Sequence, residues 1–200
     1  MRTVEMGNFS PQRKTISVND KFGNSGIKNQ QGSTVIKYDT LPLDGRTEYR
    51  FFEGASQRNF PFSNTGSDGN KLGVGNSMVV ERVYLSLVTF DTVVRDSITG
   101  IQPLLIGTTN GNILAAQFTF AIANTAVIKD IPVLSWVPQF NKMAENAVNT
   151  NFEFDTQVVV PPLLEYIASL RLPVGVTTAN VSLRLTIEGA GAIISPRATF

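Results

Sequence analysis

The chain has 200 residues, a formal net charge of +1 and a charged fraction of only 16%, against about 25% in an average globular domain. It contains neither cysteine nor histidine, which excludes disulfides, thiolate nucleophiles, Ser–His–Asp relays and metal centres built on Cys or His. The hydrophobic fraction of 42% is enough for one domain with its own core, and the small charged fraction predicts that neighbouring copies cover part of the surface.

Residues 1–32 differ in composition from the rest of the chain. They are rich in Asn, Gln, Ser and Gly, lack apolar periodicity, and hold five basic and two acidic residues, a net charge of +3. We expect an extended amino-terminal arm, held by the domain surface or by a neighbouring copy. Its candidate inter-subunit contacts are Arg2, Phe9, Arg13, Lys14, Phe22 and Lys28. So few cations favour clamping of neighbours over packaging of a genome, which needs dense basic runs.

Residues 33–200 are predicted to form one β-sandwich. Short strands are expected at 34–38 and 47–53, on either side of a turn-like LPLDG, followed by a Gly-, Asn- and Ser-rich loop at 54–77. Strong alternation begins at Met78 and predicts a long central strand, covered on both sides over part of its length. One face of this strand would carry Val79, Val83, Leu85 and Leu87, and the other Val80, Tyr84, Val88 and Phe90.

Four more segments alternate between apolar and polar residues, at 113–123, 151–160, 164–172 and 181–189. Their apolar faces would carry Leu114, Ala116, Phe118, Phe120 and Ile122; Phe152, Phe154, Val158 and Val160; Leu164, Tyr166, Ala168, Leu170 and Leu172; and Val181, Leu183, Leu185 and Ile187. The one plausible helix is short, at about 139–147. Roughly eight to ten strands with one polar face each predict an all-β, antiparallel sandwich with Greek-key or jelly-roll connections.

Glu153 and Asp155 are the best candidates for catalytic groups in a chain without histidine. Two residues apart on a strand, they project from the same face, and paired carboxylates can divide acid and base roles. The alternation also explains them as the solvated face opposite Phe152 and Phe154. We favour the solvated face and predict no catalytic residues.

The loop SNTGSDGNKLGVG invites a phosphate or calcium interpretation. It lacks the GxxxxGK[ST] spacing of a phosphate-binding loop, and Asp68 is its only acid, where calcium needs several oxygen ligands. A surface loop is favoured, and we expect neither a metal nor a cofactor.

Several aromatic residues precede or lie in this loop and are candidates for a sugar-binding platform: Tyr49, Phe51, Phe52, Phe60 and Phe62. On a strand, Phe51 and Phe52 point to opposite faces, so at least one belongs in the core. Trp136, the only tryptophan, fits either the core or a subunit contact. The core is favoured for both groups.

Two segments resemble capsid proteins of tailless icosahedral bacteriophages: TEYRFFEGASQRNFPFSNTGSDGNKLGVGNSMVVERVYLSL, at 47–87, and VVVPPLLEYIASLRLPVGVTTANVSLRLTIEGAGA, at 158–192. The resemblance implies a jelly-roll subunit with an extended arm and no catalytic residues. The chain is shorter than the double jelly-roll proteins of that group, which favours a single jelly roll at 33–200.

Together these patterns predict a structural protein of a virion that assembles with copies of itself into an icosahedral shell in the host cytoplasm. Its expected partners are its own copies and, where the shell contains them, other virion proteins. Direct binding to nucleic acid is expected to be weak or absent. No apolar stretch reaches the about 18 residues of a membrane helix, no secretory signal is recognisable, and Met1 followed by Arg2 indicates an unprocessed terminus. The alternatives are a ligand-binding β-sandwich, such as a carbohydrate-binding or phage receptor-binding module, and a hydrolase built on carboxylates.

Overall fold

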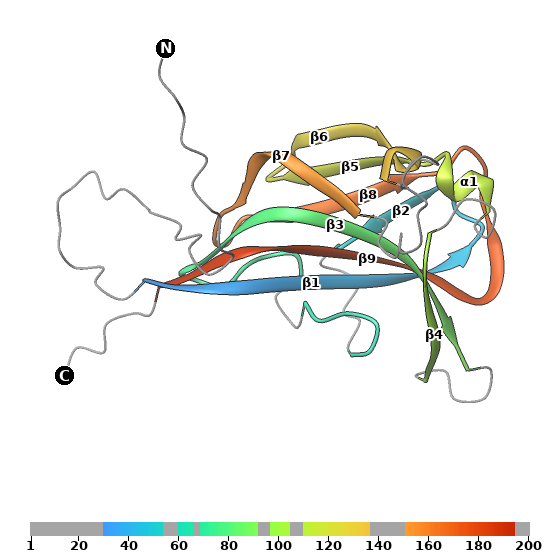
Figure 1. Ribbon diagram of the computed structural model, residues 1–200, viewed down its shortest axis with the longest axis horizontal. Helices are drawn as coiled ribbons and strands as arrows, with labels where there is room; N and C mark the ends of the chain where they lie inside the picture. Colours follow the sequence, from blue (N-terminus) through green and yellow to red (C-terminus); the bar gives the residue numbers. More distant parts are fainter. Residues whose placement is uncertain are drawn as a thin grey trace, which may run out of the picture.

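The computed structural model describes residues 30–53, 60–65, 69–91, 97–104, 110–136 and 151–194. The six candidate arm contacts, Asp68 and the helix predicted at about 139–147 lie outside these residues. Within them, nine strands form two facing antiparallel sheets, and two short helices lie in the connections between strands (Figure 1). The prediction of an all-β antiparallel sandwich is therefore confirmed.

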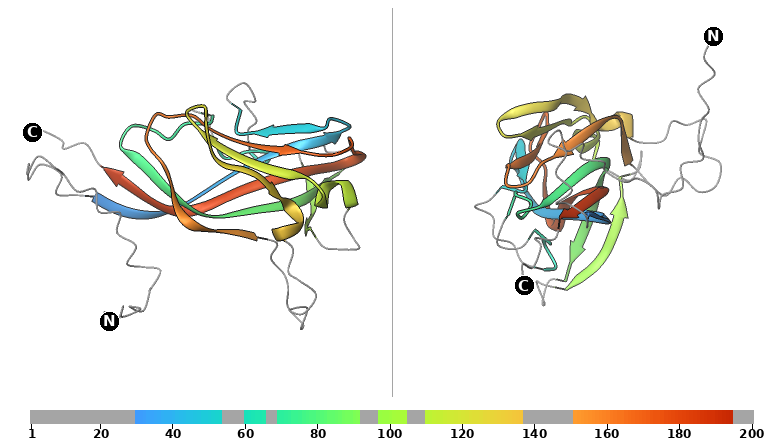
Figure 2. Two further views of the ribbon diagram at one scale, coloured as in Figure 1. Left: turned by 90° about the horizontal axis from the view of Figure 1, so that it is seen from above. Right: turned by 90° about the vertical axis from the view of Figure 1, so that its left-hand side faces the viewer.

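In chain order the elements are β1 (Gln30–Asp44), β2 (Glu48–Phe51), β3 (Asn76–Phe90), β4 (Ile98–Pro103), α1 (Gly111–Leu114), β5 (Gln117–Ile122), β6 (Thr125–Pro132), a 3₁₀ helix (Val133–Trp136), β7 (Asn151–Val160), β8 (Tyr166–Arg171) and β9 (Thr177–Ile194). The first sheet has the order β1-β9-β3, and the far edge of β3 pairs first with β7 and then with β4. The second sheet has the order β2-β8-β5-β6. The right-hand view of Figure 2 shows β5 and β6 in one layer and β1 and β9 in the other.

The core lies between the sheets and is built from the inward residues of alternating strands. The four-stranded sheet contributes mainly aromatic side chains, and the five-stranded sheet aliphatic ones. The largest buried side chains include Tyr49, Phe51, Phe118, Phe120, Tyr166, Met78, Leu85 and Leu183. Burying each such side chain contributes roughly 1.5–3 kcal/mol, so packing between the sheets is the main favourable term in folding.

A β-bulge in β3 changes which residues lie on each face of that strand, and the faces predicted from the sequence are therefore partly wrong. The pairing of β3 with β9 slips between Val80 and Arg82, which leaves Glu81 as an extra residue. Met78 and Val80 are therefore buried on the same side as Val83 and Leu85. Strict alternation placed Val80 opposite Val83, which is wrong, because one inserted residue changes the phase of the alternation.

The strand β1 is longer than predicted. Leu41 to Asp44, expected in a turn, belong to β1, and the chain turns at Gly45, whose φ of +89° suits glycine. Pro42 is accommodated because β1 is the edge strand of its sheet. Segment 60–65 covers part of this edge: Asn64 accepts from Tyr38 N at 2.8 Å and donates to the Ile36 carbonyl at 2.8 Å.

Two other predicted strands begin later than expected. The residues Ile113 and Leu114 lie in α1, where the Asn110 side chain accepts from Asn112 N at 2.9 Å and caps the helix. They are buried all the same, because the helix turns them to the core. Leu164 precedes β8 and is exposed, so its predicted place on the buried face is wrong.

Candidate assembly surfaces

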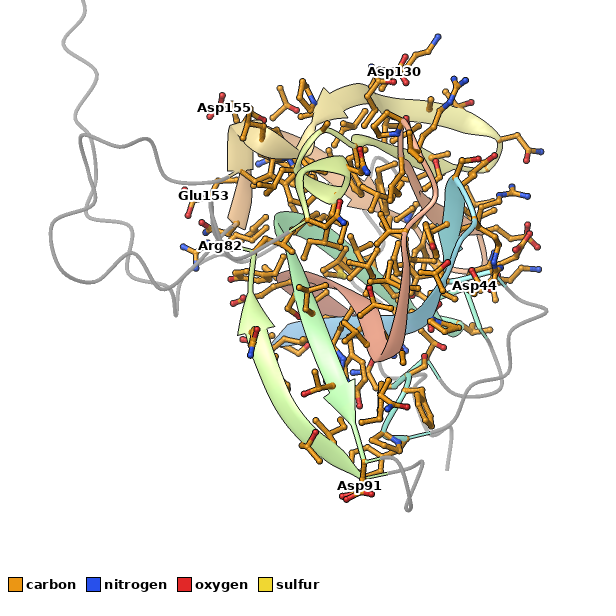
Figure 3. The ribbon with its side chains drawn as sticks, turned by 90° about the vertical axis from the view of Figure 1, so that its right-hand side faces the viewer. Asp44, Arg82, Asp91, Asp130, Glu153 and Asp155 are labelled. Atoms are coloured by element: carbon orange, nitrogen blue, oxygen red, sulfur yellow. The ribbon has the colours of Figure 1, made fainter. Side chains whose placement is uncertain are left out.

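Glu153 and Asp155 lie on the solvated face of β7, as favoured from the sequence. Both side chains are exposed, and the alternating Phe152 and Phe154 are partly buried against the core. Glu153 accepts an ion pair from Arg82 Nε at 3.0 Å. Figure 3 shows Glu153 beside Arg82, with Asp155 further along the same margin of the molecule. The arrangement is that of a cross-strand ion pair on a surface strand.

The candidate aromatic platform is divided by the fold. Tyr49, Phe51 and Phe52 are buried, so the interpretation of this group as core is confirmed for these three residues. Phe60 is 84% exposed, and Phe62 stacks on Phe90 with ring centroids 4.9 Å apart. Trp136 is also buried, edge-on to the Phe118 ring at 4.9 Å. A continuous exposed platform is therefore not formed by these residues.

Phe52 is buried together with Phe51 because the backbone reverses at this residue. Its φ of +61° ends β2 and turns the side chain back to the core, where it packs against Tyr166 with ring centroids 5.3 Å apart. The buried carboxylate of Asp39 holds this conformation, since Oδ2 accepts from Phe52 N at 2.9 Å and Oδ1 from Thr40 N at 2.9 Å. Asp39 thus links β1 to the end of β2, a role that sequence reasoning missed.

The outer face of the five-stranded sheet carries a hydrogen bond between two polar side chains. The Tyr84 hydroxyl donates to Glu188 Oε2 at 2.5 Å across β3 and β9. Burial, and secondly the hydrogen bond to Glu188, raise the pKa of Tyr84 above its ordinary value. This hydrogen bond joins the two central strands, β3 and β9, on their outer face.

Arg184 fastens segment 60–65 to the same outer face. Its Nε donates to Thr40 Oγ1 at 2.9 Å and its second terminal nitrogen to the Pro61 carbonyl at 2.7 Å. The guanidinium also lies 4.5 Å from the ring centre of Tyr38. Burial lowers the pKa of Arg184, an effect that the neighbouring Tyr38 partly opposes. A partly buried cation thus holds segment 60–65 over β1 and β9.

Exposed apolar side chains gather on two adjoining loops. The loops before β3 and before β8 are joined by hydrogen bonds from Leu163 N to the Leu72 carbonyl and from Tyr166 N to the Asn70 carbonyl, both 2.9 Å. Three side chains on these loops are exposed, and we call them the apolar knob: Val74 (80%), Leu163 (57%) and Leu164 (43%). Leu163 has a φ of +62°, which costs an ordinary residue about 1–2 kcal/mol. The fold keeps a strained, solvent-facing leucine here.

The strand edges are protected to different degrees. Edge strand β6 has register irregularities on both sides of Phe120 and carries Lys129, Asp130 and Pro132, which are devices that discourage pairing with another chain. Edge strand β2 has only four residues and exposes Glu48 and Arg50. Edge strand β4 (ITGIQP) holds no charged residue, and its Ile101 is 56% exposed.

Neither the apolar knob nor the β4 edge was among the sites expected from the sequence. The signal for β4 is an uncharged, β-branched segment that ends in proline, but a six-residue segment is too short to be identified as an edge strand by alternation alone. The signal for the knob is the run of prolines and leucines at 161–164, which the alternation interpreted as a turn and the start of a strand.

In the described part of the chain, no three Asp or Glu side chains gather in a way that would hold a metal ion. None of the helices in the described ranges is long and apolar enough to span a membrane. No protein-family model matches the sequence, and no curated protein matches it significantly. Function must therefore be argued from the fold and the surfaces described above.

Proposed function

We propose that the chain is a structural subunit of a virion, a single jelly roll that assembles with its own copies into a shell. The observation that carries this proposal is the nesting of the strand pairs. With β4 set aside, the eight remaining strands pair first with last (β1·β9), second with seventh (β2·β8), third with sixth (β3·β7) and fourth with fifth (β5·β6). A long hairpin of eight strands wrapped into two sheets would have this pattern, so the pairing supports the proposed jelly roll.

Jelly rolls also serve as lectins and cupins, so the fold by itself does not decide the function. A sugar-binding module would use a cluster of exposed aromatic rings, whereas Tyr49, Phe51 and Phe52 are core residues and, of the five candidates, only Phe60 is largely exposed. Assembly with other copies fits the small charged fraction and the apolar knob, whose Leu163 combines backbone strain with solvent exposure. Strained residues that the core does not require point to a binding role.

The arm, predicted at residues 1–32 and shortened here to 1–29 because β1 begins at Gln30, is proposed to clamp neighbouring subunits through Arg2, Phe9, Arg13, Lys14, Phe22 and Lys28. The test is a chain lacking residues 1–29, compared with the full chain by electron microscopy and circular dichroism. We expect closed particles from the full chain, and a folded β-protein without particles from the truncated one. Full-sized particles from the truncated chain would refute the clamping role, and the absence of any assembly by the full chain would refute the proposed function.

A further inference from the structure

We infer that two copies of the chain pair through β4, edge to edge and antiparallel, so that their five-stranded sheets form one continuous sheet. The inference rests on the proposed self-assembly for the identity of the partner, a second copy, and adds the surface through which two copies meet.

The position of β4 makes its edge accessible. β4 pairs with β3 along Ser86–Phe90 only, and within the described ranges no strand pairs with its other edge. Figure 1 shows the β3–β4 hairpin projecting from the body of the sandwich, and Figure 3 shows β4 at the outer margin of its sheet. Within the described ranges, this edge of β4 is therefore available to a second strand.

The composition of β4 is the opposite of that found at the other edges. Strands β2, β6 and β7 each expose charged side chains, and part of the β1 edge is covered by segment 60–65. Among the residues that the structure describes, β4 has none of these protections except Pro103 at its last position, which removes one donor. An unprotected edge with unpaired N–H and C=O groups is a ready template for another strand.

The same composition selects a second β4 as the occupant. Antiparallel pairing of β4 with its own copy follows a two-fold axis, the commonest symmetry of homo-oligomers. Each residue then faces the residue placed symmetrically across the axis, and because β4 holds no charged residue, no pair of like charges enters the contact. With the axis near Gly100, the exposed Ile101 of each copy lies on the neighbouring strand's flank and loses its contact with water.

The test places a charge of either sign at residue 101, so that two different variants attract each other only if β4 pairs with β4. Ile101→Lys and Ile101→Asp are each expected to weaken pairing at least about 10-fold, because each places two like charges within a few ångströms of the axis. An equimolar mixture of the two variants is expected to restore pairing, as hetero-pairs, measured by native mass spectrometry. Val127→Lys, at an exposed apolar position on β6, is the matched control and is expected to pair like the unaltered chain.

Circular dichroism melts establish that each variant is folded. We expect this result because both substituted positions are exposed on edge strands. Restoration in the mixture supports the β4 contact, since folding defects are not rescued by mixing. If Ile101→Lys assembles as the unaltered chain does, or if two folded variants fail to pair when mixed, the β4 contact is wrong while the proposed function stands. An unaltered chain that never self-associates would overturn the proposed function, and this inference with it.

Discussion

Replacing the buried Asp39 tests how the two sheets are joined at the end of β2. Asp39→Ala removes both oxygens that accept from Phe52 N and Thr40 N, each at 2.9 Å. A hydrogen bond to a charged group contributes about 1.5–3 kcal/mol, so the two bonds are worth at most about 6 kcal/mol. Removal of a buried charge returns part of this energy. We expect a net loss of about 3 kcal/mol in the free energy of unfolding.

The assay is equilibrium unfolding in urea at equal protein concentrations. With a slope of about 2 kcal/mol per molar urea, a loss of that size lowers the midpoint by about 1.5 M. Asp39→Asn keeps one acceptor oxygen, so its urea midpoint is expected to lie between those of Asp39→Ala and the unaltered chain. Asp155→Ala, at an exposed carboxylate on β7, is expected to leave the midpoint almost unchanged. If Asp39→Ala unfolds at the same urea concentration as the unaltered chain, Asp39 does not hold the Phe52 turn.

Four further substitutions are expected to change stability in different directions. Gly189→Ala would put Cβ 1.8 Å from the Val79 carbonyl oxygen and should cost about 3 kcal/mol or more in a urea titration, while Gly111→Ala, with open space around it, should be neutral or slightly stabilising. Leu163→Asn relieves a left-handed leucine and should raise Tm by about 2–4 °C; an unchanged or lower Tm would contradict the strain. Tyr166→Phe removes a buried hydroxyl that has no hydrogen-bond partner among the described residues, so Tm should hold or rise.

The same Tyr166 makes a prediction about pH. Burial, and secondly the charge of Asp39, raise the pKa of Tyr166 above its ordinary value of 10.0. The proton is held more tightly in the folded chain, so this contribution to stability is complete below pH 10 and is lost as the pH rises towards the folded pKa. Above pH 10, the Tm of Tyr166→Phe should therefore fall less steeply with rising pH than the Tm of the unaltered chain. An equal decrease of Tm with pH in both proteins would contradict the assignment.

Much of the fold could be predicted because one face of each outer strand meets solvent. In β7, Val158 and Val160 are buried while Glu153, Asp155 and Gln157 are exposed, as the period of two requires. The same holds for Phe118 and Phe120 in β5. The alternation therefore predicts both where such a strand lies in the sequence and which of its faces is buried, because burial decides which residue type is tolerated at each position.

The failures have a different physical origin. Glu81 forms a bulge in β3 that no pattern of hydrophobicity reveals, because the extra residue depends on how β9 and β7 pair with β3. Leu164 follows the left-handed Leu163, and the strand begins only after both residues. The β4 edge and the apolar knob depend on which strands end up at a margin, and that follows from topology rather than from local sequence.

The most direct test of self-assembly is the mass of the purified full chain in solution, measured by light scattering at near-physiological salt over a range of concentrations. We predict defined multimers or particles many times heavier than the 21.8 kDa chain, formed without any added ligand. A mass of 21.8 kDa that does not change with concentration would contradict the proposed role as a shell-forming subunit.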